Sequence, residues 1–73
     1  DRAENILRSI GVTDVRVRDY KDTARIEVCQ QDLGVVLQHA SLIHHQISDL
    51  GYRYVTLDLG GLRSGNLNEA LEL

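Results

Sequence analysis

The segment VRVR contains two arginines, Arg16 and Arg18, spaced two residues apart in an alternating run of apolar and charged residues. On a β-strand, residues at this spacing project from the same face. Their guanidinium groups can therefore donate paired hydrogen bonds to one phosphate or carboxylate. Arg25 is expected nearby on a partner strand. The alternative is a solvated face on which Glu27 pairs with Arg16, an arrangement that is common and contributes little to stability.

A glycine-rich loop, GGLRSGN, follows the last apolar run of the chain. Its backbone N–H groups could wrap an anion, with an arginine supplying charge. The loop is not a P-loop, because no GK[ST] follows at the required spacing. The alternative is a tight turn into a short terminal helix capped by Asn66. The candidate residues of this loop are Gly60, Gly61, Arg63, Ser64 and Gly65.

Neither the histidines nor the single cysteine forms a recognisable catalytic or metal site. His45 and Asp49 are four residues apart on a predicted helix and could pair or share a metal. Two ligands do not make a metal site, so we interpret these residues, with His39 and His44, as solvated helix side chains. Cys29 has no positioned base beside it, which argues against a nucleophile. We therefore predict no catalytic residue within this chain and no metal bound by it.

Hydrophobic periodicity predicts the order helix, strand, strand, helix, strand. Asp1 can cap the first helix and Gly11 can end it. The runs VTDVRVRDY and ARIEVC alternate around the polar turn YKDT, as in a β-hairpin. A long helix follows Asp32, which could cap it, and ends at Gly51; YRYVTLDL then alternates as a third strand. The apolar stripe of the long helix comprises Val36, Ala40, Ile43, Ile47 and Leu50, and the inward residues of the third strand are Val55, Leu57 and Leu59.

This order predicts an α+β fold, a small three-stranded sheet with two helices on one face. Two strand orders satisfy it. With the first strand central the sheet is fully antiparallel; with the second strand central the second and third strands pair in parallel. We favour the first order. In either case the open face of the sheet carries Arg16, Arg18, Arg25, Glu27, Tyr54 and Thr56.

Size and composition narrow the function classes. The chain has 73 residues and a net charge of −3, which predicts a single domain over residues 1–73 near the lower size limit for an independent core. The acidic balance argues against nucleic-acid binding. No apolar run approaches the roughly 20 residues that span a bilayer, so no membrane partner is expected. One cysteine is typical of a reducing cytoplasm. Because the chain opens on Asp1 and not on Met, we expect a piece cut from a longer protein or a processed chain.

Three segments resemble the C-terminal domain of the LarE-type sulfur transferases, in the PP-loop ATP-pyrophosphatase superfamily: VRVRDYKDTARIEV, DLG, and LGYRYVTLDLGGLRSGNLNEAL. The resemblance implies a C-terminal accessory domain of an enzyme that uses ATP and Mg²⁺ to adenylate a pyridinium carboxylate. That enzyme then transfers sulfur to it for the nickel-pincer cofactor of lactate racemase. The implied partners are an N-terminal PP-loop domain of the same chain and further copies in a homo-oligomer.

The resemblance also implies roles for individual residues. Arg16 and Arg18 match family arginines that bind phosphate, and Glu4 and Asp32 match acidic residues near that site. The nucleotide motif S-G-G-x-D-S is absent from this chain, and Cys29 stands where the family commonly has proline. We therefore do not expect Cys29 to donate sulfur. The glycine loop is expected to fix the chain end against a neighbouring subunit, with its glycines allowing close backbone approach.

A second hypothesis belongs to another class. The chain would be a free-standing α+β interaction or regulatory module, similar in outline to small ferredoxin-like ligand-sensing domains. The charged sheet face would then bind a protein partner, and nucleotides would have no effect on it.

Overall fold

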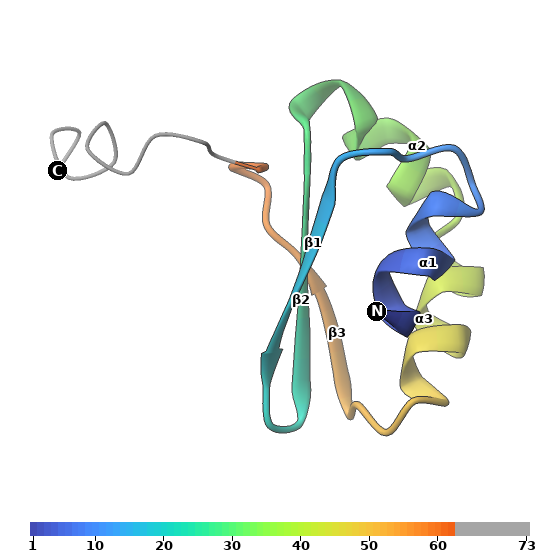
Figure 1. The fold of residues 1–73 in the computed structure, drawn as a ribbon, viewed down its shortest axis with the longest axis vertical. Helices are drawn as coiled ribbons and strands as arrows, with labels where there is room; N and C mark the ends of the chain where they lie inside the picture. Colours follow the sequence, from blue (N-terminus) through green and yellow to red (C-terminus); the bar gives the residue numbers. More distant parts are fainter. Residues whose placement is uncertain (63–73) are drawn as a thin grey trace, which may run out of the picture.

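The computed structural model describes residues 1–62, in which one three-stranded sheet is covered on one face by helices (Figure 1). The predicted order of helices and strands is confirmed. The elements are α1 (Arg2–Arg8), β1 (Val15–Tyr20), β2 (Thr23–Val28), the 3₁₀ turn η1 (Gln30–Asp32), α2 (Leu33–Gln38), α3 (Ala40–Ser48) and β3 (Tyr54–Leu57).

The helix ends follow from local chemistry. The Asp1 carboxylate accepts a hydrogen bond from Ala3 N at 2.8 Å and caps α1. Gly11 and Gly51 adopt φ of 101° and 114° after α1 and α3, a conformation that side chains other than glycine rarely adopt. Asp32 occupies the N-cap position of α2, but its side chain makes no capping hydrogen bond.

The predicted long helix is two helices that meet at His39, whose φ and ψ are −108° and 24°. The His39 ring Nδ1 lies 2.9 Å from Val35 O, and His39 N donates to Val36 O at 3.1 Å. The bond to Val36 O reaches back three residues, so the chain forms a 3₁₀-like turn at His39 before α3 begins. Ala40 lies exposed just after the break, and Leu50 lies exposed beyond α3, whereas the rest of the stripe is buried.

The strand order is β1-β2-β3, so the favoured prediction of a central first strand was wrong. β2 pairs antiparallel with β1 and parallel with β3. One reason lies at the outer edge of β1, where Val17 N donates to Glu4 Oε2 at 3.2 Å. Because α1 already satisfies this outward N–H, that edge is less available to a third strand.

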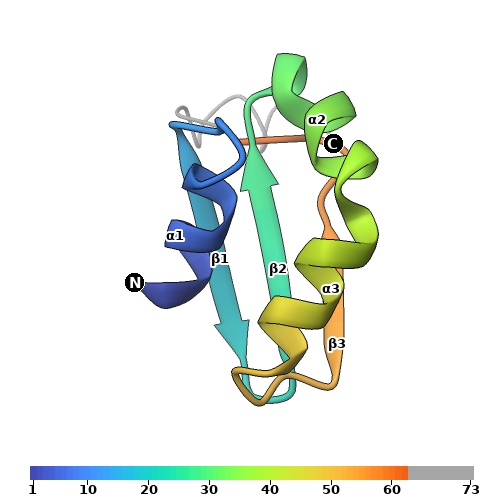
Figure 2. The same cartoon turned by 90° about the vertical axis from the view of Figure 1, so that its right-hand side faces the viewer.

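The core lies between the sheet and the helices, with α1 over β1 and α3 toward β3 (Figure 2). Its fully buried large side chains are Leu7, Val12, Ile26, Val28 and Ile47. The third strand ends at Leu57, two residues earlier than predicted, because a turn begins at Asp58. Leu59 therefore does not face the core and is 71% exposed. No helix within residues 1–62 is long and apolar enough to cross a bilayer.

Candidate functional site

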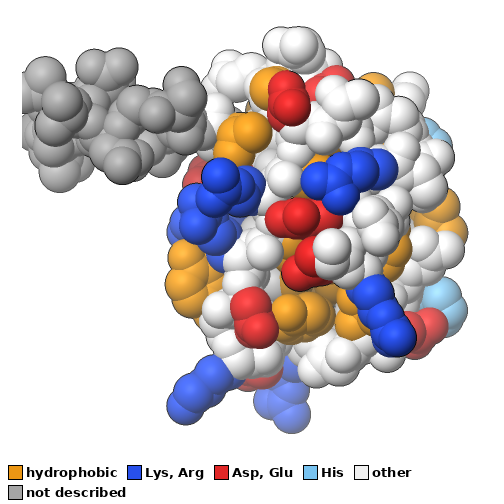
Figure 3. Space-filling model, in the orientation of Figure 1, with side chains coloured by type: hydrophobic (Ala, Val, Ile, Leu, Met, Phe, Trp, Pro, Cys, Tyr) orange, Lys and Arg blue, Asp and Glu red, His pale blue; other side chains and the backbone are white. Residues whose placement is uncertain are grey.

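The arginines predicted to bind an anion lie on the sheet face that the helices leave open. Arg16 is opposite Glu27, and Arg18 is opposite Arg25, in the antiparallel register of β1 and β2. In Figure 3, which views the sheet from its edge, the open face lies at the left, and Lys and Arg side chains are visible there as well as at the right and bottom of the molecule. The sheet therefore brings together the pair expected from the sequence and adds Arg25 to it.

Glu27 links two of these arginines. Its Oε1 accepts from Arg18 Nε at 3.3 Å, and its Oε2 accepts from Arg25 Nε at 3.2 Å and from Arg25 Nη2 at 2.8 Å. The pairing of Glu27 with Arg16, considered from the sequence, is absent from the described part of the chain. The hydrogen bonds that Arg25 donates to Glu27 raise the pKa of Arg25 above its ordinary value.

Arg16 is exposed and forms no ion pair among residues 1–62. With Arg18 and Arg25 positive and Glu27 negative, these four side chains sum to +2 in a chain of net charge −3. A local surplus of fixed positive charge on an open surface favours a bound anion. Asp58, just past β3, accepts from Gly60 N at 2.8 Å within its own turn.

Glu4 is hydrogen-bonded to the backbone of the strand that carries Arg16 and Arg18. Its Oε2 accepts from Val17 N, the residue between Arg16 and Arg18, and its Oε1 lies 3.7 Å from Arg8 Nη2. Glu4 thus holds the strand that carries both arginines. Asp32 is half-buried at the start of α2, and within the described residues no hydrogen bond or ion pair joins its side chain to the arginines.

The start of the glycine loop packs against its own domain. Gly61 is buried with φ of 78°, and a Cβ added there would lie 2.9 Å from Val28 O. Leu62 N donates to Val28 O at 2.7 Å, and Gln30 Nε2 donates to Gly60 O at 3.3 Å. The close backbone approach at Gly61 is to β2 of the same domain, and docking against a neighbouring subunit stays a prediction. Arg63, Ser64 and Gly65, and the terminal helix considered at Asn66, lie outside the described residues.

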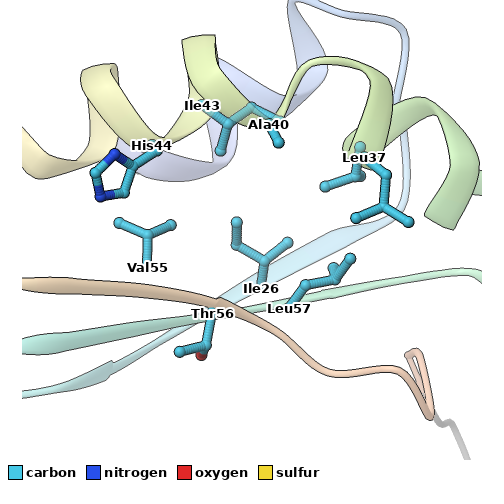
Figure 4. Close-up of a pocket in the computed structure, with 9 residues that line it drawn as sticks. Ile26, Leu37, Ala40, Ile43, His44, Val55, Thr56 and Leu57 are labelled. Carbon is cyan, nitrogen blue, oxygen red and sulfur yellow. The ribbon is translucent and has the colours of Figure 1, made fainter.

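An apolar groove of about 210 Å³ opens between β3 and the helices α2 and α3 (Figure 4). Leu37, 60% exposed, and Leu57 lie at one end, and His44 and Val55 lie at the other. This groove was not predicted from the sequence, because no glycine or proline marks the break at His39 that turns α2 relative to α3.

The remaining polar candidates stand apart from the arginines. His45 Nε2 lies 3.6 Å from Asp49 Oδ2, so the predicted i,i+4 pair forms on the exposed face of α3. Cys29 is free and half-buried at the start of η1. Among the described residues, no three His, Cys, Asp or Glu side chains are grouped as metal ligands.

Arg25 and Glu27 were placed on the open face but not predicted as site residues. Their signal was present in the hairpin register. A two-residue turn at Lys21 and Asp22 pairs Tyr20 with Thr23, which puts Arg18 opposite Arg25. The register alone does not predict that the Glu27 side chain extends diagonally to Arg18 instead of pairing with Arg16.

The chain is similar over almost its whole length to two longer bacterial proteins. It is 49% identical over 69 residues to pyridinium-3,5-bisthiocarboxylic acid mononucleotide synthase of Lactiplantibacillus plantarum, covering 94% of this chain and 25% of that protein. It is 42% identical over 72 residues to an uncharacterized protein, slr1717, of Synechocystis sp., covering 96% of this chain and 27% of that protein. No protein-family model matches the chain.

The chain thus spans about a quarter of the length of the curated relatives that it matches. The aligned residues make up 94% of the chain, so the similarity takes in all or most of each helix and strand. The resemblance seen in the sequence is confirmed: the chain matches a C-terminal domain of LarE type.

Proposed function

We propose that this chain is the C-terminal domain of an ATP-dependent sulfur transferase, in which Arg16 and Arg18 bind phosphate at the active site. The parent enzyme adenylates a pyridinium carboxylate and sulfurates it for nickel-pincer cofactor biosynthesis. The 49% identity to a synthase named for a pyridinium bisthiocarboxylic acid mononucleotide supports this reaction class. A reducing cytoplasm suits the single cysteine of this chain.

The observation that carries the proposal is the open sheet face. Arg16, Arg18 and Arg25 project from two paired strands, and one buried carboxylate holds two of them. The sheet fixes the backbone of these residues, and Glu27 holds the guanidinium groups of Arg18 and Arg25 in place before a ligand arrives. Preorganised donors of this kind stabilise charge that develops during a reaction.

The chemistry of the donors fits a phosphate group. Guanidinium N–H groups donate in pairs to phosphate oxygens and do not bind metal ions. In the parent enzyme, ATP supplies the adenylyl group, and the N-terminal PP-loop domain holds ATP and Mg²⁺. Arg16 and Arg18 would hold a substrate phosphate or the phosphate of the adenylate leaving group and stabilise its charge.

Subunit contacts complete the proposal. The domain covers the active site of its partner domain, and the loop from Gly60 to Gly65 docks against a neighbouring subunit of a homo-oligomer. The 73-residue size supports this arrangement, because a small domain buries a modest share of its surface.

A second candidate function rests on the groove at β3. An apolar groove lined by Leu37, Val55 and Leu57 suits a small apolar ligand or a protein segment. This observation favours an interaction or regulatory module. In that case ligands act at His44 and Val55, and substitution of the arginines has no effect on the activity.

The proposal is tested by the double variant Arg16→Ala with Arg18→Ala in the enzyme that contains this domain. We expect sulfur transfer to fall about 10²-fold or more, the usual cost of removing a donor to developing charge. The fold should persist, because Arg25 still pairs with Glu27. Arg53→Ala is the matched control, since Arg53 is exposed and makes no ion pair within residues 1–62. Sulfur transfer within twofold of the unaltered enzyme in the folded double variant would refute the assignment.

A further inference from the structure

Glu27 is buried on a face that is otherwise open. Its side chain is 8% exposed, whereas those of Arg18 and Arg25 are 45% and 42% exposed. Burial of a carboxylate costs several kcal/mol unless charged donors compensate it. The two arginines supply that compensation by lying against both carboxylate oxygens.

Stability alone does not explain this arrangement. Replacing a buried ion pair by apolar residues of similar size is often neutral or stabilising. What the carboxylate does is fix the positions of two guanidinium groups. Arg18 and Arg25 are directly opposite on paired strands, where like charges repel one another. Glu27 bridges them, and Arg25 is further held over the Tyr20 ring, 5.3 Å from its centroid.

The bridge leaves donors free. Arg18 uses only Nε on Glu27, and Arg25 uses Nε and Nη2. Within residues 1–62, the two Nη groups of Arg18 and Nη1 of Arg25 have no hydrogen-bond partner. With Arg16 on the same sheet face, the three arginines and Glu27 carry a surplus of +2, which the nearby Asp58 carboxylate partly offsets at Arg25.

The geometry points to Glu27 as a positioning residue and to Arg25 as a third anion-binding residue beside Arg16 and Arg18. A surplus of positive charge on three arginines fits a phosphate group, free or in a monoester. This inference rests on the proposed phosphate site on the same sheet face. It adds the residue that orients the donors and the charge of the ligand.

Titration of this chain with inorganic phosphate tests the inference, followed through the arginine Nε–Hε signals by nuclear magnetic resonance, with chloride at equal ionic strength as the reference. We expect saturable shifts at Arg16, Arg18 and Arg25. Arg25→Lys keeps the charge and loses the planar fork, so phosphate affinity should fall about fivefold to tenfold. Arg53→Ala is the control and should bind as the unaltered chain does.

Glu27→Gln separates positioning from charge. Removing one negative charge would by itself tighten phosphate binding. Because glutamine offers one acceptor oxygen instead of two, it releases one guanidinium, so we expect affinity to fall about tenfold and one of the two Nε–Hε signals, of Arg18 or of Arg25, to move to an exposed value. Backbone amide spectra establish that each variant is folded. If Glu27→Gln does not fold, Arg25→Lys alone decides the question.

Unchanged phosphate affinity in Arg25→Lys would overturn the inference, and so would equal or tighter binding by folded Glu27→Gln. The test is independent of sulfur transfer. Loss of phosphate binding in these variants, together with normal turnover in the Arg16 and Arg18 double variant, would uphold the anion site and reject the proposed function. The reverse pattern would reject the roles of Arg25 and Glu27 only.

Discussion

At the residue scale, two polar side chains that are at least half-buried, Glu27 and Tyr52, affect different properties of the protein. Glu27 is buried with charged partners and organises the open face. Tyr52 is half-buried, and burial raises the pKa of its phenol above the ordinary value, with the Asp19 carboxylate adding to the shift. The first arrangement serves binding in our account, and the second affects stability alone.

Tyr52 should make folding stability depend on alkaline pH. Its pKa is raised in the folded state, so the unfolded chain loses this proton first as the pH rises. The contribution is therefore complete below the ordinary tyrosine pKa of about 10 and is lost as the pH rises through the folded pKa. Urea unfolding from pH 9 upward should show this decline, and Tyr52→Phe should reduce it. Tyr54→Phe, at an exposed position, is the control. An identical pH profile in Tyr52→Phe would show that Tyr52 is not responsible.

At the element scale, the turn after β3 closes against the end of β2. Gly61 lies where its backbone faces Val28 O, and its positive φ adds a second requirement for glycine. Gly34 in α2 is different, because a Cβ there would meet nothing within 4 Å. The two glycines therefore predict opposite effects of the same substitution.

Gly61→Ala should destabilise the fold by about 1–3 kcal/mol, from backbone strain and the contact with Val28 O. Gly34→Ala should stabilise it by about 0.5–1 kcal/mol, because alanine favours the helix. Urea unfolding of both variants measures the difference. Equal stabilities for the two variants would contradict the close packing of the loop against β2.

The sequence allowed the elements to be predicted better than their arrangement. Asp1, Gly11 and Gly51 mark helix ends by local chemistry, and strand alternation identifies the hairpin. The strand order could not be predicted from these local patterns, since both orders bury the same apolar residues. The contact of Glu4 with Val17 N depends on tertiary structure. The helix break at His39 was not predicted either, because the apolar stripe continues across it.

The candidate site was predictable to a similar extent. Spacing alone placed Arg16 and Arg18 on one face, and the register of the hairpin adds Arg25. The choice of Glu27 partners was not predictable, because it depends on side-chain reach across the strands rather than on which residue stands opposite. The prediction that Leu59 faces inward failed because alternation does not show where a strand ends.

At the scale of the whole molecule, two surfaces are available for function. The open sheet face carries arginines, and the groove beside β3 is apolar. The excess negative charge of the chain lies elsewhere, so the arginine face is a local exception to the overall charge of −3. Anionic and apolar ligands should therefore bind at different places, which makes the two candidate functions separable in one experiment.

That experiment is a titration of the unaltered chain with AMP, a phosphate monoester, while backbone amide and arginine Nε–Hε signals are recorded. Our account predicts saturable shifts centred on Arg16 and Arg18, with no shift at Arg53 and weakening as salt is added. Shifts confined to the groove at His44 and Val55, or no saturable shift at any residue, would contradict phosphate binding by the open sheet face.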